Sequence, residues 1–202
     1  MVSKAPIVGL FVLIGVAAAA LAQTAPTVRV RGAVQALDGQ TLVVKAREGD
    51  TLRIVLADNY VVMAVRPIAV DSIKAGAYVG AASMKQADGS FKALEVLVFP
   101  DSARGSGEGH YPWDLQPESM MTNATIGSVA EGTDGRRIVL TNKDGSFNMT
   151  VPPGVPVVTF EPGEKSMLMP GAKVFIGTQK QPDGRLTAAR VLVGKDGLTP
   201  PM

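Results

Sequence analysis

The chain of 202 residues contains no cysteine and a single histidine, and only 5% of its residues are aromatic. Without cysteine, the protein has no disulfide, no thiolate metal site and no catalytic thiol. One imidazole excludes metal sites that need two or more histidines, such as the helical zinc-protease motif. So few aromatic residues also argue against extended stacking surfaces for sugars or bases.

The chain also lacks strong charge, because its formal net charge is only +2. A near-neutral chain offers no electrostatic argument for binding nucleic acid or an acidic membrane surface. Beyond the N-terminal segment, no apolar run is long enough to span a bilayer. Apolar residues nowhere recur at helical spacing over three turns, which argues against a helical fold.

The N-terminus has the layout of a secretory signal peptide. Lys4 supplies a positive charge, residues 5–22 are uncharged, and Ala20-Leu21-Ala22 is a small-x-small cleavage signal before Gln23. The alternative is an uncleaved membrane anchor, but the run is only as long as the shortest spanning helices and ends in weakly apolar alanines. The sequence therefore predicts a cleaved signal over residues 1–22, a periplasmic protein and no membrane span afterwards.

The remaining chain contains two similar segments. Asp38-Gly39 recurs 96 residues later as Asp134-Gly135, and Lys85 to Gly89 recurs 95 residues later as Lys180 to Gly184. This many ordered matches, with one slip, indicate a duplication. We predict a β-barrel repeat at 23–99, a Gly/Pro-rich aromatic linker at 100–123, and a second repeat with a C-terminal tail at 124–202.

Each repeat is patterned as short strands. Asp38-Gly39 is a hairpin turn between apolar, β-branched segments, and Thr41–Lys45, Leu52–Leu56 and Tyr60–Val65 follow as strands. Asp71–Gly76 is typical of one helical turn, and two more strands complete the repeat. We predict an all-β protein of two tandem OB-like barrels, each with five to six strands. Small β-sandwiches are the alternative.

The module resembles a family of exported bacterial domains of unknown function, whose pattern includes Gly-x-Val, Leu-x-Val, Gly-x-x-Val, Asp-Gly and Ala-x-x-Val. The matching residues are Gly32 to Val34, Leu42 to Val44, Gly76 to Val79, Asp88-Gly89 and Ala93 to Val96, with counterparts at Gly127 to Val129, Ile138 to Leu140, Gly171 to Val174, Asp183-Gly184 and Ala188 to Val191. The second copy departs from the pattern in one extra residue before Asp134 and in an Ile-x-Leu strand.

The whole chain is similar to a group of proteobacterial two-repeat proteins. They share Gly107 to His110, Pro112 to Leu115 and the ending Gly194 to Pro201. Some members carry the label of a metal-transporter permease, which this sequence does not fit because a permease needs several spanning helices. The resemblance implies the fold and the export of the protein, and no activity.

The linker holds the only histidine and the only tryptophan, three residues apart. In the simplest interpretation, Tyr111, Trp113 and Leu115 anchor the linker on a barrel as an apolar plug. We predict a partner surface of Glu108, His110, Tyr111, Trp113 and Asp114, in a protein that binds a protein or an envelope component.

The alternative function is a copper(I) carrier or sensor. Thioether and imidazole groups suit that ion, and a tryptophan face attracts cations. His110, Met120 and Met121, beside Trp113, are the candidate ligands, and Met167 and Met169 form a second thioether pair. The resemblance of this set to OB-fold periplasmic copper-efflux chaperones is loose. Otherwise no cofactor is expected.

Catalysis has little support in the sequence. Ser102, Ser106, His110 and Asp114 match a catalytic triad by residue type, but a glycine-rich linker supplies no rigid support or oxyanion hole. Glu108 and Asp114 lie in a loop that fixes no separation between two carboxylates. We therefore predict that the protein is not an enzyme.

Overall fold

The computed structural model describes residues 26–202, and most of this part of the chain is β-strand. The predicted signal peptide lies outside the described residues. In chain order, the strands are β1 (Thr27–Asp38), β2 (Thr41–Ala46), β3 (Thr51–Pro67), β4 (Tyr78–Lys85), β5 (Phe91–Val98), β6 (Gly109–Pro112), β7 (Met120–Gly132), β8 (Gly135–Asn142), β9 (Gly145–Val151), β10 (Val157–Pro162), β11 (Lys173–Lys180) and β12 (Leu186–Gly194). Short 3-10 helices connect some of them: η1 (Val70–Ser72), η2 (Asp101–Ala103), η3 (Lys165–Met167) and η4 (Lys195–Gly197). The all-β prediction is confirmed.

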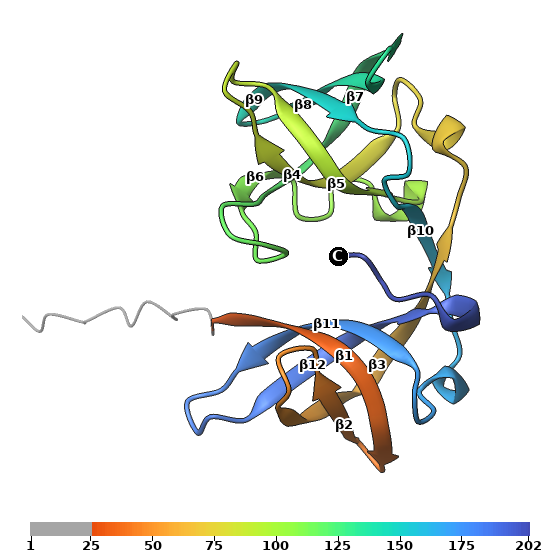
Figure 1. Cartoon of the computed structure of the whole chain (residues 1–202). Coiled ribbons are helices and arrows are strands. Elements are labelled where there is room, and N and C mark those ends of the chain that lie inside the picture. The colour runs from red at the N-terminus through yellow and green to blue at the C-terminus, as the bar shows by residue number, and fades with distance from the viewer. Residues whose placement is uncertain (1–25) are drawn as a thin grey trace, which may run out of the picture.

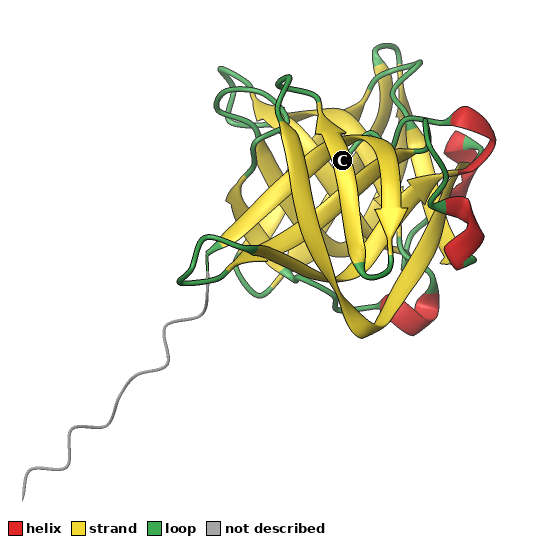
Figure 2. Ribbon diagram, turned by 90° about the horizontal axis from the view of Figure 1, so that it is seen from below, coloured by secondary structure: helices red, strands yellow, loops and turns green. Residues whose placement is uncertain are grey.

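The strands form two closed barrels, one above the other in Figure 1. In the first barrel, β1, β2 and β3 form an antiparallel meander, and β11 and β12 form a hairpin. Antiparallel pairing of β1 with β11 and parallel pairing of β3 with β12 close the ring. Figure 2 shows these strands from below, with the short helices gathered on one side.

The second barrel has the same plan. The meander is β7, β8 and β9, and the hairpin is β4 and β5. β4 pairs with β7, and two parallel residue pairs, Phe91 with Met149 and Lys92 with Thr150, join β5 to β9. A three-strand meander closed by a hairpin is the predicted OB-like arrangement, and the β-sandwich alternative is excluded.

The two barrels exchange strands, so the prediction that each repeat closes its own barrel is wrong. The first barrel takes its meander from residues 27–67 and its hairpin from residues 173–194. The second barrel takes its meander from residues 120–151 and its hairpin from residues 78–98. The segments 23–99 and 124–202 are thus sequence repeats, but neither is a barrel.

The length of β3 explains the exchange. Leu52–Leu56 and Tyr60–Val65, predicted as separate strands, are parts of this one 17-residue strand. At about 3.3 Å per residue it extends roughly 55 Å, well beyond one barrel. The chain therefore reaches the second barrel before η1 and β4. The equivalent stretch of the second repeat is split into β9 and β10 at Pro152-Pro153, because proline has no N–H for the ladder.

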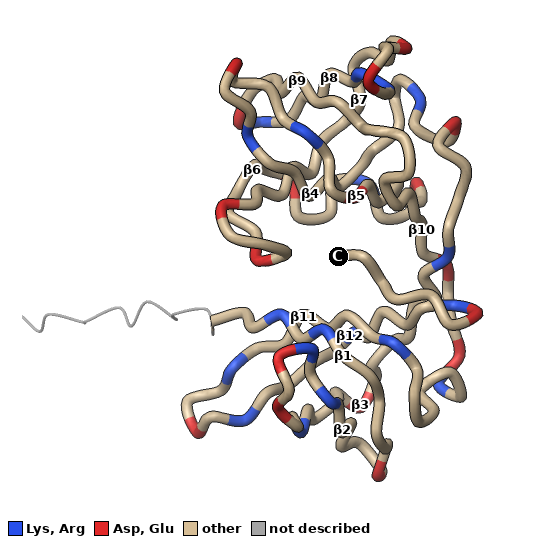
Figure 3. Tube along the Cα trace, in the orientation of Figure 1, with Lys and Arg blue, Asp and Glu red and all other residues tan. Residues whose placement is uncertain are grey.

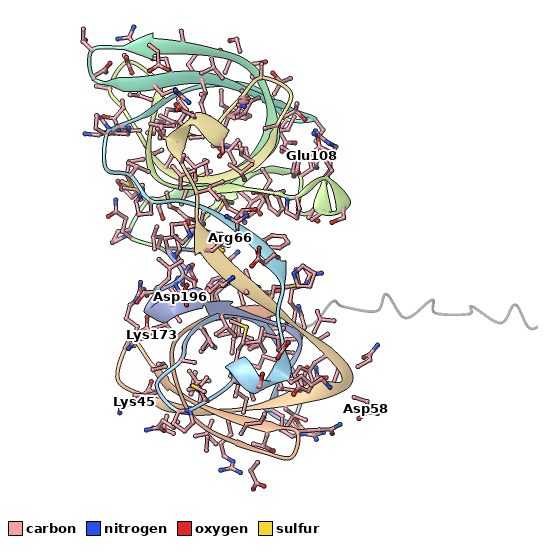
Figure 4. All side chains as sticks on the ribbon, turned by 90° about the vertical axis from the view of Figure 1, so that its right-hand side faces the viewer. Lys45, Asp58, Arg66, Glu108, Lys173 and Asp196 are labelled. Atoms are coloured by element: carbon pink, nitrogen blue, oxygen red, sulfur yellow. The ribbon has the colours of Figure 1, made fainter. Side chains whose placement is uncertain are left out.

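The two crossing strands meet at a pseudo-twofold axis. β10 pairs antiparallel with the end of β3, and Phe160 lies opposite Val65, its own counterpart 95 residues earlier. A residue that pairs with its repeat equivalent marks the axis. Arg66 Nε donates to Glu161 Oε2 at 2.9 Å across this pair of strands. Figure 4 shows Arg66 at the crossing between the barrels.

The segment 100–123 does not join the barrels, which corrects its predicted role. It connects β5 to β7, two strands of the same barrel, and contributes β6, which pairs with the start of β7. The connections between barrels are instead the β3–β4 and β10–β11 crossings. Within this segment, residues 109–112 extend the sheet of the second barrel by pairing with β7.

One local prediction is confirmed, and two others are partly correct. Asp38-Gly39 turns β1 into β2, and Gly39 has a φ of 56°, which favours glycine. The helical turn predicted at 71–76 is only partly correct, because the 3-10 helix η1 spans Val70–Ser72 and ends before Ile73. The expectation that Tyr60–Val65 is buried on both sides is only partly correct, because Val61 is 46% exposed.

The apolar residues form three clusters. One fills the first barrel around Leu42, Ile54 and Ile176, and one fills the second around Ile126, Leu140 and Met149. The third lies between the barrels and contains Val65, Leu97, Val158, Phe160 and Met202. The last residues of the chain run between the barrels, as Figure 1 shows, so that this third cluster fixes the two barrels against each other. Among residues 26–202, no helix combines the length and apolar character needed to cross a bilayer.

Candidate functional site

A cavity of about 180 Å³ lies where the two barrels meet. Residues from both barrels and from the β6 loop line it. The aromatic residues among them are Phe99, Tyr111, Trp113, Phe160 and Phe175, and the polar or charged ones are Glu95, Asn123 and Arg190. A mostly apolar cavity with a few convergent polar groups is the usual form of a small-molecule site.

A glycine in β4, Gly80, is among the residues that line the cavity. Leu97, Gly80 and Asn123 lie side by side across β5, β4 and β7. A Cβ added at Gly80 would be 2.5 Å from Asn123 Oδ1 and 3.1 Å from a Phe99 ring carbon. Glycine is therefore required at this position, because the side chains of Asn123 and Phe99 occupy the space that a Cβ would need.

A β-bulge aims Glu95 into the cavity. The register between β4 and β5 shifts so that Ala93 and Glu95 lie opposite adjacent residues of β4, leaving Leu94 as the extra residue. Ala93 and Val96 both face the core of the second barrel. Without the bulge, Glu95 would share the inward face of Ala93. With it, the carboxyl group points out of the barrel, where it lines the cavity.

Glu95 is fully buried, and neither of its carboxyl oxygens has a hydrogen-bond partner among the described residues. Burial raises the pKa of this carboxyl to about 8, although the positive charge of Arg31 lowers it in part. Burying a carboxyl group without a hydrogen-bond partner lowers the stability of the folded protein. Its presence here therefore points to a role other than stability.

Arg31 of the first barrel, whose charge acts on Glu95, already has hydrogen-bond partners. Its Nη2 donates to Asp114 Oδ1 at 2.7 Å, and its Nε donates to the backbone oxygen of Met202. Asp114 also forms an ion pair with Arg29, whose Nη1 lies 3.6 Å from Asp114 Oδ2. Burial raises the pKa of Asp114, but the hydrogen bond and charge of Arg31 and the charge of Arg29 outweigh this and lower it. Figure 3 shows basic residues along the face of the first barrel that meets the second.

Trp113 connects the β6 loop to the first barrel. Its ring centroid lies 6.2 Å from that of Phe175 in β11, and the guanidinium carbon of Arg29 lies 3.9 Å from the ring centroid. The ring centroid of Tyr111, in β6, lies 6.1 Å from that of Trp113. These contacts match the predicted apolar plug. The indole Nε1 is buried without a partner among the described residues, and Trp113 lines the cavity.

His110 lies on the opposite face of β6 from Tyr111, since successive strand residues alternate. Its ring stacks on Phe147 with centroids 4.3 Å apart, and Nδ1 is 2.8 Å from Thr122 Oγ1. Burial lowers the pKa of this imidazole, although Asp144 opposes the shift. His110 thus covers one end of the second barrel, away from the cavity that Trp113 lines.

The remaining metal candidates are also divided. Met121 pairs with Tyr111 and lines the cavity, whereas Met120 packs on the core of the second barrel. Met167 packs on the core of the first barrel, and Met169 is 61% exposed. Residues 26–202 contain no group of three or more acidic, histidine or cysteine side chains arranged to hold a metal.

The two predicted acidic residues have separate partners. Glu108 Oε1 accepts a hydrogen bond from the backbone N–H of Lys143 at 3.1 Å, while Asp114 bonds Arg31. The structure therefore brings Tyr111 and Trp113 together at the cavity, with Asp114 bonded beside it. It places Glu108 and His110 elsewhere.

Sequence reasoning missed Glu95, Arg31 and Gly80. The available signal was a lone acidic residue inside the apolar strand Phe91–Phe99. The bulge and the contact with the first barrel determine the environment of Glu95, and neither can be recognised from the neighbouring residues in the sequence. Comparison with family models, with curated proteins and with solved structures found no match to this chain. The family resemblance therefore stays a prediction.

Proposed function

We propose that this protein is a non-catalytic binding protein that holds a small molecule in the cavity between its barrels. The observation that carries the proposal is the Glu95 carboxyl, fully buried, facing the cavity and unpaired. The Trp113 indole N–H supplies a second unpaired group in the same cavity. An acceptor and a donor without partners, set among aromatic walls, suit a guest that brings the missing hydrogen bonds.

A small molecule suits this cavity better than the protein or envelope partner expected from the linker. The cavity is about 180 Å³ and lies between two packed barrels, so a flat partner surface has no access to Glu95. The two exposed residues of the predicted surface, Glu108 and Asp114, do not line the cavity. Periplasmic location stays part of the proposal, because it rests on the N-terminal segment.

The test is to block the cavity and measure binding of defined probes. Leu192 lines the cavity, and Leu192→Trp would fill much of it. We expect ligand-observed NMR with benzylamine, benzyl alcohol and benzoate to show binding of at least one probe to the wild type and none to this variant. Met169→Trp adds the same ring at an exposed site and serves as the control. Equal binding by wild type and Leu192→Trp would contradict the proposal.

Copper(I) binding is the second candidate, and Met121 is the one predicted ligand that lies beside Trp113 at the cavity. The thioethers of Met121 and Met202 line the same cavity as Trp113. Such soft ligands suit copper(I). Titration of the reduced metal, followed by Trp113 fluorescence, should show quenching that Met121→Leu weakens and His110→Ala leaves unchanged. The reverse dependence, or no quenching, would argue against this candidate.

A further inference from the structure

The cavity between the barrels contains one acidic group and no cation bonded to it. Glu95 is fully buried, and both carboxyl oxygens are free to accept hydrogen bonds. An ionised carboxylate accepts several hydrogen bonds and donates none. A guest that satisfies Glu95 in its charged form must therefore bring N–H or O–H donors.

The surrounding charges determine which guest is favoured. From β1, Arg31 is bonded to Asp114 and Met202, and no ion pair joins it to Glu95 among the described residues. From β12, Arg190 lines the cavity at its exposed rim, and it stands at the repeat position equivalent to Glu95. On β5 itself, Lys92 is exposed. None of these cations neutralises the buried carboxyl, so a positively charged guest supplies the missing partner.

The walls suit a cation as well. Phe99 and Phe160 meet edge to face with centroids 5.8 Å apart, and Tyr111 also lines the cavity. Trp113 and Phe175 already carry Arg29 and Arg31 over their rings, so the other three rings are the ones open to a guest. The faces of aromatic rings attract organic cations. An anionic guest would meet the Glu95 oxygens, and a neutral guest would leave the carboxyl to keep its proton in the apolar cavity.

The size of the cavity limits the guest. About 180 Å³ corresponds to roughly six water molecules at about 30 Å³ each. A single ring with a one-carbon ammonium group fits this volume, whereas a peptide or a nucleotide does not.

We propose that the cavity between the barrels selects a small protonated amine, whose ammonium group pairs with Glu95 and whose apolar body contacts the aromatic walls. This inference rests on the proposed function and gives it a ligand class.

The pairing has a consequence for protons. Because burial raises the pKa of Glu95 to about 8, the free protein holds this carboxyl mainly protonated at neutral pH. Binding of an ammonium ion favours the carboxylate, so the Glu95 proton passes to the buffer while the ligand keeps its own. Amine binding should therefore release protons at pH 7 and strengthen as the pH rises from 6 to 8.

The experiment compares three probes of similar shape and different charge: benzylamine, benzyl alcohol and benzoate. Isothermal titration calorimetry at pH 7, in two buffers of different ionisation enthalpy, measures both affinity and proton release. We expect benzylamine to bind at least tenfold more tightly than the other two, with release of protons. Glu95→Gln should reduce benzylamine to the affinity of benzyl alcohol. Asp58→Asn, at an exposed edge of the first barrel far from the cavity (Figure 4), should change nothing.

The outcomes separate the two proposals. Benzyl alcohol or benzoate binding as tightly as benzylamine, in a manner blocked by Leu192→Trp, would overturn the amine inference and leave small-molecule binding intact. Benzylamine binding that Glu95→Gln does not weaken would do the same. No cavity-dependent binding of any probe would overturn both. The comparison among probes uses wild-type protein, so it does not depend on the folding of a variant.

Discussion

The two surfaces that face each other between the barrels are built from equivalent repeat positions, yet their side chains differ. Gly80 on the second barrel corresponds to Phe175 on the first, and Glu95 corresponds to Arg190. Inside the barrels, by contrast, apolar residues occupy equivalent positions, as with Val96 and Val191. The inward faces need the same volume in both copies, while the outward faces at the axis meet each other and were free to diverge. Both pairs of positions line the cavity, where one surface carries a glycine and an acid and the other carries a ring and a base.

The largest expected effect comes from separating the repeats. Residues 23–99 alone contain the meander of one barrel and the hairpin of the other, and these do not pair with each other among the described strands. We expect this fragment to form no folded monomer, and to be either unfolded or a strand-exchanged dimer. Circular dichroism and light scattering check this. A folded monomer would show that each repeat closes its own barrel after all.

Next in size is the pH dependence caused by Glu95. Because burial raises the pKa of Glu95 to about 8, the folded protein keeps this proton over a range in which the unfolded chain has lost it. The free energy of unfolding should therefore fall as the pH rises from about 4.5 to 8, by at most about 5 kcal/mol from this group.

Replacing Glu95 with Gln removes this contribution while keeping the shape. The stability of Glu95→Gln relative to the wild type should rise between pH 5 and pH 8.5 in urea unfolding. Glu161→Gln, at an exposed ion pair, is the matched control and should give no such trend. Parallel pH profiles for wild type and Glu95→Gln would mean that the carboxyl finds a partner in solution.

Trp113→Ala tests how firmly the β6 loop is held to the first barrel. The change removes the contacts with Phe175 and Arg29. Because Trp113 is only partly buried, we expect a loss of about 2 kcal/mol, below the 3–5 kcal/mol of a core tryptophan. The melting temperature measures it. An unchanged melting temperature would show that Trp113 does not anchor the loop and would favour a purely functional role.

An effect of similar size is expected at Gly80. Gly80→Ala places a methyl group against Asn123 and Phe99 and should cost about 1–3 kcal/mol in urea unfolding. Gly177→Ala is the control in the equivalent hairpin of the first barrel, where an added Cβ meets no atom within 4 Å. Equal effects of the two substitutions would mean that Gly80 is not needed for packing at the cavity.

The site was predictable only where it depends on local chemistry. Tyr111 and Trp113 stood out as apolar anchors in a glycine-rich segment, and both line the cavity. His110 stood out equally, but strand alternation in β6 turns it to the other face, against Phe147. Glu95 did not stand out, because a bulge at Leu94 and the approach of a distant barrel decide its environment.

By itself, the sequence determined the strands, their turns and their inward faces, because these depend on neighbours within a few residues. It also determined the OB-like order of a meander and a hairpin. Only the tertiary structure decided which hairpin closes which meander. Two similar repeats offer similar strand edges, so pairing within and between repeats have nearly the same local pattern. Two features favour the exchange of hairpins between the repeats: the uninterrupted length of β3 and the pairing of Val65 with Phe160 at the axis. The exchange brings Glu95 and Trp113 to one cavity.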